Sequence, residues 1–370
     1  MDLWHALDLR DLTNPAHGPH ALQLLLDDVL ATLVDAWGCD LDVQRRHPVV
    51  AVADNYDHLG YAPDAVTRDA RYTHYVSGAM MLRSHTSAGV PPALRALGGT
   101  PPRDLLLALP GMVHRRDTID RLHVGTPHQV DLWRVGGKPL RVADLEEFVG
   151  LLVGAVLPGA AWRTVATVHP YTEHGLQVDV ETPDGWVELA ECGLAAPHVL
   201  RAAGLDPARC HGLALGMGLD RALMLRKGID DIRVLRSGDR RVSAQLQDLL
   251  PFRPVSKNPP VRRDLSIVVD GPTDAELLGD AVRTALGPDV EDLETVEVLS
   301  STAHDDLPVA ARERLGIAPG QVNVLLRVVL RPLSRTLTDT EANVLRDRVY
   351  AAVHRGSRAQ WARPGGVPRG

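Results

Sequence analysis

The sequence predicts an α+β protein in which helices flank a mainly antiparallel sheet and a second, smaller α/β domain follows. Short strands separated by turns cluster in the middle of residues 1–237, and helical patterns lie toward the two ends. This grouping favours an antiparallel sheet over a doubly wound parallel one. From about Asn258 the strand and helix patterns start again, which predicts the second domain.

Composition and charge limit the classes of protein to which the chain can belong. Its 370 residues are enough for two or three domains. The formal net charge of −7 argues against a wide nucleic-acid footprint, and we expect no DNA partner. Three cysteines without CxxC spacing indicate a reducing compartment and no zinc site. Neither a signal peptide nor an apolar run of about 18 residues is visible, so we expect a cytoplasmic protein without a membrane partner.

Hydrophobic spacing locates the elements of the larger domain. Helical spacing predicts helices over residues 19–37, 93–97 and 140–157. Alternating runs predict strands over residues 105–113, 129–135, 163–168, 176–181 and 186–192. The turn residues Pro183, Asp184 and Gly185 predict a hairpin between the last two strands. We also expect a strand and then a loop within residues 42–61.

The second domain has a β-α-β-β-α pattern. Strands are predicted over residues 264–269, 293–298 and 322–330, and helices over 275–286 and 339–353. This order is typical of a ferredoxin-like α/β sandwich, with a last strand lost or distorted. The predicted organisation is therefore a domain over 1–237, a linker over 238–257, a ferredoxin-like domain over 258–358 and a disordered tail over 359–370.

A first cluster of polar residues is Arg83-Ser84-His85-Thr86-Ser87. These side chains can donate hydrogen bonds, which suits a carboxylate or a phosphate ligand. A surface turn with a helix cap is the alternative, because Ser and Thr are common caps.

A second cluster crowds His, Arg and Asp residues into residues 112–135. Alternation along a strand places Val113, Arg115 and Asp117 on one side, with His114 and Arg116 on the other. A cross-strand ion pair would explain any one Arg and carboxylate. It explains the repeated crowding less well.

A third cluster is Gly216-Met217-Gly218-Leu219-Asp220-Arg221. It is either a tight turn before a helix or a place where the backbone approaches a neighbouring strand closely. It is not a Walker loop, because no GK[ST] follows. Arg221 could reach a bound anion, or it could pair with a nearby acid on the surface.

Together, in their order and spacing, these clusters resemble motifs of the class II aminoacyl-tRNA synthetases in the phenylalanyl form. GLALGMGLDRALMLRKGI is similar to motif 3 and VHRRDTIDRLHVGTPHQVD to motif 2. The segment from FRPVSKNPP to SRTLTDTEANVLRDRV resembles the ferredoxin-fold anticodon-binding domain of single-chain enzymes. The resemblance implies a class II catalytic domain, ATP, Mg²⁺ and an amino acid as ligands, tRNA as a partner, and a monomer or homodimer.

The resemblance also implies roles at the ATP end of the site. Arg115 matches the residue that holds the α-phosphate, and Arg221 matches the one that takes the γ-phosphate. These two are the expected catalytic residues, and Glu188 is an expected metal contact. Further ATP-binding positions are Asp117, His123, Gly216 and Gly218.

At the amino-acid end, Gln129 and Asp131 match the residues that bind the substrate α-amino group. The other expected amino-acid-binding residues are His85, Thr86, Ser87, His169, Tyr171, Glu191 and Ala214. The expected tRNA-binding residues are Lys257, Arg262 and Arg263.

The side-chain pocket departs from the family pattern. Where the family has Phe-Pro-Phe-Thr, this chain has His169-Pro170-Tyr171-Thr172, and Glu191 stands where the family has glycine. Polar groups left unpaired in a buried pocket cost about 1–3 kcal/mol each, so a substrate other than phenylalanine is one hypothesis. The alternative is that His169 and Tyr171 still stack on a phenyl ring while their polar ends reach water.

Three functions are compatible with these residues. The first is a tRNA ligase for phenylalanine or a related aromatic or polar amino acid. The second is an adenylate-forming ligase that transfers the acyl group to a carrier protein or a small amine. The third is a regulatory protein without catalysis, which the presence of Arg115, Arg221 and Gln129 disfavours. The C-terminal domain and the basic run over residues 226–263 favour tRNA over the second acceptor.

Overall fold

The computed structural model describes residues 3–70, 72–115, 120–254, 258–271, 274–333 and 335–359. By their contacts the residues form two compact units. The larger comprises residues 2–115 and 126–253, and the smaller contains residues 116–125 and everything from Pro254 onward. The two units are described separately below.

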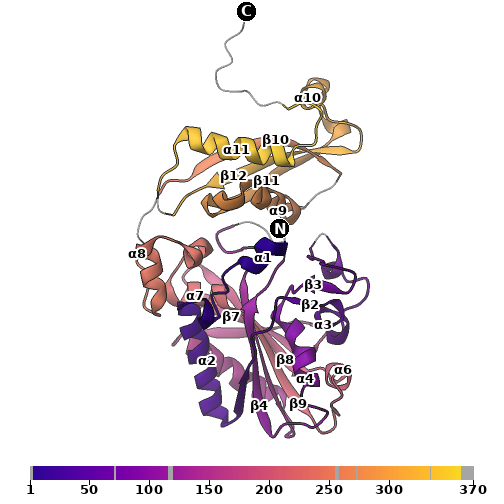
Figure 1. Ribbon diagram of the computed structural model, residues 1–370, viewed down its shortest axis with the longest axis vertical. Coiled ribbons are helices and arrows are strands. Elements are labelled where there is room, and N and C mark those ends of the chain that lie inside the picture. Colours follow the sequence, from indigo (N-terminus) through magenta and orange to yellow (C-terminus); the bar gives the residue numbers. More distant parts are fainter. Residues whose placement is uncertain are drawn as a thin grey trace, which may run out of the picture. The chain divides into compact units, whose positions relative to one another are not determined.

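A seven-stranded sheet forms the centre of the larger unit (Figure 1). Its order is β1 (Asp40–Val43), β4 (Asp104–Met112), β5 (His128–Gly136), β9 (His211–Gly218), β8 (Gly185–Ala195), β7 (Thr172–Thr182) and β6 (Trp162–Ala166). β1 runs parallel to β4, and all the other neighbours are antiparallel. The predicted antiparallel character is confirmed.

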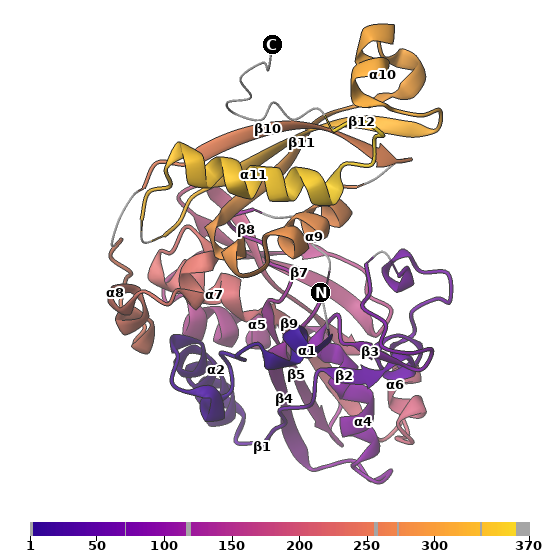
Figure 2. The same ribbon diagram turned by 45° about the horizontal axis from the view of Figure 1, so that its top comes forward.

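Helices cover both faces of this sheet. α2 (Ala21–Trp37), α5 (Val142–Val156) and α7 (Leu219–Lys227) pack against one another on one face (Figure 2). On the other face, α4 (Val90–Arg95) and α6 (Pro197–Ala202) share a buried apolar cluster with Leu109, Trp133 and Ala214 of the strands. Each face therefore has its own apolar core.

Shorter elements complete this unit. They are α1 (Leu3–Asp8), β2 (Val49–Ala51), α3 (Val52–Asn55), β3 (Met80–Leu82) and α8 (Arg240–Ser243), and β2 pairs with β3. The predicted long helices and strands are confirmed apart from their ends. β9 is not among the predicted strands, because its glycine-rich end predicts only a tight turn or a close backbone approach before a helix. The hairpin at Pro183–Gly185 is confirmed, because Thr182 pairs with Gly185.

The predicted linker over 238–257 is mostly folded. Val242 and Leu246 are buried, and Phe252 N donates a hydrogen bond to Lys227 O (2.7 Å). Lys227 is 1% exposed and its Nζ lies 2.9 Å from Asp248 Oδ1. These contacts attach residues up to Arg253 to the larger unit, which corrects the predicted boundary.

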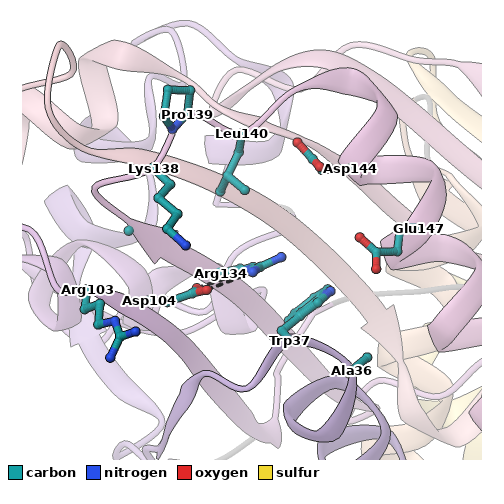
Figure 3. A pocket seen from close by; sticks show the side chains of 11 residues that line it. Ala36, Trp37, Arg103, Asp104, Arg134, Lys138, Pro139, Leu140, Asp144 and Glu147 are labelled. Carbon is teal, nitrogen blue, oxygen red and sulfur yellow. Dashed lines mark hydrogen bonds and ion pairs between the residues drawn. The ribbon is translucent and has the colours of Figure 1, made fainter.

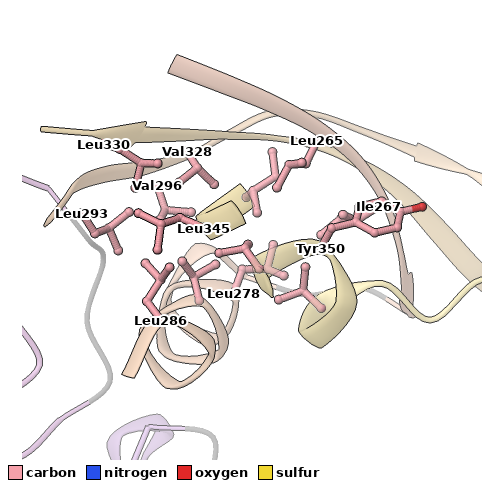
Figure 4. Close-up of a cluster of buried hydrophobic side chains, with 14 of the residues drawn as sticks. Leu265, Ile267, Leu278, Leu286, Leu293, Val296, Val328, Leu330, Leu345 and Tyr350 are labelled. Atoms are coloured by element: carbon pink, nitrogen blue, oxygen red, sulfur yellow. The ribbon is translucent and has the colours of Figure 1, made fainter. Parts of the chain in front are cut away.

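A three-stranded antiparallel sheet and two long helices form the smaller unit. Its order is β10 (Val261–Asp270), β12 (Gln321–Leu330) and β11 (Leu293–Ala303). α9 (Ala275–Leu286) and α11 (Asp339–Val353) pack on one face of this sheet, as Figure 4 shows for the core around Leu278, Val328 and Tyr350. α10 (Val309–Leu315) is an unpredicted insertion, and its Leu315 packs against Val268.

Two further sequence expectations can be compared with the described residues. No helix among them is long and apolar enough to cross a membrane. Cys39, Cys192 and Cys210 are buried free thiols. The predicted disordered tail lies outside the described residues from position 360 onward.

Candidate active site

The sheet brings the predicted amino-acid-binding residues into register. Asp131 of β5 pairs with Gly216 of β9, and Gly216 pairs in turn with Glu191 of β8. Gln129, two residues before Asp131, pairs with Gly218. Directly opposed residues of an antiparallel pair project to the same face, as do alternate residues of one strand. Gln129, Asp131 and Glu191 therefore project from one face, on either side of the two glycines.

Gly216 and Gly218 leave this face open. A Cβ atom added to either glycine would meet no heavy atom within 4 Å. Gly111 on β4, which pairs with Gln129, differs because a Cβ there would collide with the guanidinium of Arg83. Gly216 and Gly218 lie at the end of β9, immediately before α7. Between β5 and β8 the base of the site is therefore bare backbone, and we call these two residues the glycine floor.

Asp131 is enclosed by hydrogen-bond donors. Its Oδ2 accepts hydrogen bonds from Thr86 Oγ1 (2.7 Å) and Ser87 Oγ (3.0 Å), and its Oδ1 accepts one from Trp133 Nε1 (3.4 Å). The residue is 3% exposed, and burial raises the pKa of its carboxyl group although the three hydrogen bonds lower it. The predicted Ser/Thr cluster and the predicted acid thus meet at one place.

His85 contacts Tyr61 and lies close enough to Arg115 to feel its charge. Its ring stacks on that of Tyr61, with centroids 5.7 Å apart and planes 21° apart. Burial, followed by the charge of Arg115, lowers the pKa of His85 to about 4. The imidazole is therefore neutral at physiological pH. Arg115, the predicted α-phosphate residue, comes shortly after the end of β4 and contributes a positive charge at this edge of the site.

Arg221 lies at the start of α7 beside Glu188 of β8. Its Nη1 donates a hydrogen bond to Glu188 O (3.2 Å) and lies 3.9 Å from Glu188 Oε1. Both side chains are partly exposed. The guanidinium therefore lies near the end of β9 that carries Gly218.

Glu188 is the predicted metal contact. Within the described parts of the chain, no group of three or more His, Cys, Asp or Glu residues is arranged to hold a metal ion. In nucleotide sites, Mg²⁺ is usually held by one or two carboxylates and by phosphate oxygens. The partly exposed carboxylate of Glu188, adjacent to Arg221, fits that donor set.

A contact between His169 and Glu191 lies across Gly216 from Asp131. His169 Nε2 is 2.8 Å from Glu191 Oε2. The His169 ring lies 5.6 Å from that of Tyr171, and Tyr171 lies 6.4 Å from Tyr61. Burial raises the pKa of Tyr171, and the nearby charges of Asp131 and Glu191 raise it further. The predicted pocket residues are thus close to one another and to Asp131.

Ala214 belongs to the apolar layer beneath this group. It is 1% exposed and lies in the same buried cluster as Trp133, against which Tyr171 packs. Ala214, one of the expected amino-acid-binding residues, is therefore part of the apolar core on the same face of the sheet as Asp131.

Two features of the site are not predicted by the sequence. One is Tyr61, whose ring joins His85 to Tyr171. The other is the buried pair of His128 and Asp220, with Nδ1 and Oδ1 2.9 Å apart. His128 precedes Gln129 and Asp220 precedes Arg221, so this pair connects β5 to α7 next to two site residues. The partners are separated by 92 residues, and no local pattern signals their contact.

Three predicted site residues, Asp117, His123 and Lys257, lie outside the described part of the larger unit. Asp117 and Lys257 lie outside the described residues. His123 pairs with Asp120 (2.7 Å), and its segment belongs by contacts to the smaller unit. The role of His123 at the ATP end therefore stays a prediction.

The two predicted tRNA-binding arginines of β10 face different surroundings. Arg262 is exposed. Arg263 donates hydrogen bonds to Asn343 Oδ1 (3.0 Å) and Asp339 Oδ1 (2.8 Å) of α11. Arg263 thus holds α11 on the sheet, a structural role that was not predicted.

A separate pocket of about 340 Å³ lies at the opposite end of β4 and β5 (Figure 3). Its residues include Asp104 and Arg134, whose ion pair measures 2.8 Å, and Trp37, whose ring lies 4.4 Å from the Arg134 guanidinium. None of the predicted site residues lines it. We therefore treat it as distinct from the candidate active site.

Comparisons with known proteins agree with the geometry of the larger unit. Residues 15–246 match the family of tRNA synthetases class II core domain (F). The chain is 37% identical over 237 residues to the phenylalanine–tRNA ligase alpha subunit of Prochlorococcus marinus strain MIT 9313, covering 64% of this chain and 69% of that protein. It is 34% identical over 249 residues to the alpha subunit from Bifidobacterium animalis, covering 62% and 68%.

A third relative has a different extent of similarity. The chain is 27% identical over 322 residues to the chloroplastic/mitochondrial phenylalanine–tRNA ligase of Arabidopsis thaliana. The match covers 83% of this chain and 70% of that protein. Since the larger unit ends at Arg253, this similarity extends into the smaller unit.

Proposed function

The chain belongs to the family of class II tRNA synthetase core domains, and from this premise we propose that it activates an amino acid with ATP and transfers it to tRNA. The relatives are named phenylalanine–tRNA ligases, so the proposed activity is of the phenylalanyl-tRNA synthetase type. The observation that carries the proposal is the open glycine floor, with Gln129 and Asp131 on one side and Arg221 at the helix that follows.

In the proposed first step, the amino-acid carboxylate attacks the α-phosphorus of ATP. The bond to the β,γ-pyrophosphate breaks, so the products are the aminoacyl-adenylate and pyrophosphate. Arg115 binds the α-phosphate, where negative charge develops, and Arg221 binds the γ-phosphate. A preorganised guanidinium at such a position stabilises the transition state. Mg²⁺ supplies further neutralisation of the phosphate charge when it is bound beside Glu188.

The remaining residues hold the amino acid. Gln129 and Asp131 bind the α-ammonium group, and the hydroxyls of Thr86 and Ser87 keep the Asp131 carboxylate in place. No general base is required because the attacking carboxylate is already ionised. His85 stays neutral beside Arg115 and therefore does not add charge to the site.

In the second step, a ribose hydroxyl at the end of tRNA attacks the adenylate and AMP leaves. We propose that the smaller unit is a ferredoxin-fold anticodon-binding domain that presents tRNA for this step. Two observations support this proposal. β10 and β11 lie on either side of β12 with α9 between them in sequence, as in a split β-α-β unit. The similarity to the chloroplastic/mitochondrial ligase of Arabidopsis thaliana also extends past Arg253.

ATP–pyrophosphate exchange by the purified chain, assayed with each of the twenty amino acids, tests the first step. We expect exchange with at least one aromatic amino acid. Arg115→Ala and Arg221→Ala should each lower it by about 10²–10³-fold, because each removes a group that binds developing charge. Arg201→Ala, at an exposed arginine of α6, is the control and should leave exchange unchanged.

Aminoacylation of total tRNA by the same chain, with no second polypeptide added, tests the second step. Charging of one tRNA species would agree with the proposal. Exchange without any charging would instead favour a ligase whose acyl acceptor is a carrier protein or a small amine. Unaltered exchange in both Arg115→Ala and Arg221→Ala would contradict the assigned ATP end.

A further inference from the structure

The two carboxylates that flank the glycine floor lie in different surroundings. Asp131 and Glu191 are in register with Gly216 on the intervening strand. Neighbouring strands are about 4.8 Å apart, so the backbones of the two acids are separated by roughly 10 Å. Asp131 is 3% exposed and already accepts three hydrogen bonds. The Glu191 side chain is 36% exposed and contacts His169 through one oxygen, Oε2.

Aromatic rings line the space between these acids. Tyr171 is close enough to both carboxylates that their charges raise its pKa. Tyr61 adjoins Tyr171 on one side, and His169 adjoins it on the other. The same two carboxylates also raise the pKa of Tyr61, after burial. Gly216 is in register with both acids, and a Cβ atom added to it would meet no heavy atom within 4 Å, so the space directly above it is open to a substrate side chain.

The distance between Asp131 and Glu191 determines which group of a bound aromatic amino acid reaches Glu191. An aromatic amino acid whose ammonium group binds at Asp131 directs its side chain across Gly216 toward β8. Its far ring edge then meets the Glu191 carboxylate, held by His169. The Glu191 side chain is 36% exposed in the free protein, and a ring bound there covers its carboxylate from water. A covered charged acceptor left without a donor costs about 1–3 kcal/mol or more, so a plain phenyl ring is disfavoured there. A site built to hydrogen-bond a substrate group discriminates strongly against an analogue without it.

We propose that Glu191 selects an aromatic amino acid whose ring carries a hydrogen-bond donor, such as a hydroxyl or an amine, at its far end. His169 is the positioning residue, because it holds Glu191 Oε2 at 2.8 Å and leaves Oε1 for the substrate. This inference rests on the proposed amino-acid activation, and it names the substrate class of that site.

The test is ATP–pyrophosphate exchange by the full chain with phenylalanine, tyrosine and 4-aminophenylalanine, each measured as kcat/KM. We expect tyrosine or 4-aminophenylalanine to exceed phenylalanine by at least about tenfold. Glu191→Gly removes the acceptor and should lower this ratio at least about tenfold, chiefly through KM for the donor-bearing substrate. Its kcat/KM for phenylalanine should be higher than that of the unaltered chain, because the carboxylate that a phenyl ring leaves without a donor is gone.

Two variants of His169 test whether this residue positions Glu191 or only supports the fold. His169→Leu removes the contact with Glu191 and should lower the same ratio, whereas His169→Gln keeps a donor and should largely preserve it. A thermal melt of each variant verifies that it is folded.

Three outcomes would overturn the inference. Preference of the unaltered chain for phenylalanine would overturn it alone and leave the proposed activation standing. An unchanged ratio in folded Glu191→Gly would do the same. Exchange with no amino acid at all would overturn the proposed activation, and this inference with it.

Discussion

His114 is a residue whose burial is not matched by hydrogen bonds. It is 0% exposed, and neither ring nitrogen has a hydrogen-bond partner within the described part of the chain. Burial, followed by the positive charge of Arg83 and other neighbours, lowers its pKa to about 4. The imidazole is thus held neutral in the folded protein.

This burial predicts a pH-dependent stability. The pKa of His114 is about 4 when folded, against 6.5 for a solvated imidazole, and the pKa values of His20 and His85 are lowered in the same way. Between these pH values the unfolded chain binds more protons, so stability is full above about pH 6.5 and is lost as the pH falls toward 4. Each histidine contributes a slope of about 1.4 kcal/mol per pH unit in that window.

His114→Phe tests this argument, because it removes both unpaired nitrogens and one titrating group. At pH 7.5 we expect the free energy of unfolding to rise by about 1–3 kcal/mol. At pH 5 the gain should be larger by about 2 kcal/mol. Urea unfolding at the two pH values measures both effects, with the exposed His47 changed to Phe as a control. Equal losses of stability on acidification in the variant and the unaltered protein would contradict the assignment.

At the scale of elements, glycines on neighbouring strands have opposite roles. A Cβ on Gly193 of β8 would lie 2.7 Å from Thr172 Cβ and 3.0 Å from Glu173 O, which are atoms of the adjacent strand β7. A Cβ on Gly216 of β9 would meet nothing within 4 Å. Gly193 is thus required for strand packing, and Gly216 keeps the face of the site open.

The matched pair Gly193→Ala and Gly216→Ala separates these roles. Gly193→Ala should lower the free energy of unfolding by about 1–3 kcal/mol, because the strands must move apart. Gly216→Ala should leave stability within about 0.5 kcal/mol and still reduce ATP–pyrophosphate exchange, since its methyl group occupies the substrate floor. Thermal unfolding and exchange are measured on both variants. Loss of stability in Gly216→Ala without loss of exchange would contradict the open-floor interpretation.

The helices and strands also show which sequence signals are sufficient to predict an element. α9 and α11 agree with their predicted ranges, because Asp274 and Thr338 cap their first turns and apolar spacing defines their faces. β9 was missed as a strand because its sequence HGLALGMG contains three glycines and no polar alternation, while it is paired on both sides in the sheet. Tertiary pairing, which no local pattern records, makes it a strand.

Contacts between distant segments limit prediction of the site in the same way. The meeting of Thr86 and Ser87 with Asp131 follows from the family resemblance. The stacking of Tyr61 on His85 depends on how a loop folds back, and the His128–Asp220 pair depends on where α7 starts. The predicted linker was wrong up to Arg253 because buried Val242 and Leu246 anchor a segment whose composition is typical of a loop.

At the scale of the whole molecule, the division into two units parallels the two proposed chemical steps. The larger unit contains its own apolar cores and the described residues assigned to the amino acid and to the phosphates, apart from His123. The smaller unit has a separate core formed by α9, α11 and its three strands. With a net charge of −7, the chain attracts tRNA less through its overall charge than a basic protein would. Binding of tRNA must therefore depend on a local surface, which we assign to the smaller unit.

A chain ending at Arg253 tests this division of labour. It removes the smaller unit from Pro254 onward and retains both folded faces of the seven-stranded sheet. We expect it to melt cooperatively and to keep kcat/KM for ATP–pyrophosphate exchange within about threefold, because a change below about 0.7 kcal/mol is expected when no group at the reacting centre is lost. Charging of tRNA should fall by at least about a hundredfold, since a binding surface worth several kcal/mol is removed. A folded truncated chain that still charges tRNA at the full rate would show that the larger unit binds tRNA unaided. One that loses exchange would show that the residues from Pro254 onward, which the truncation removes, contribute to activation as well.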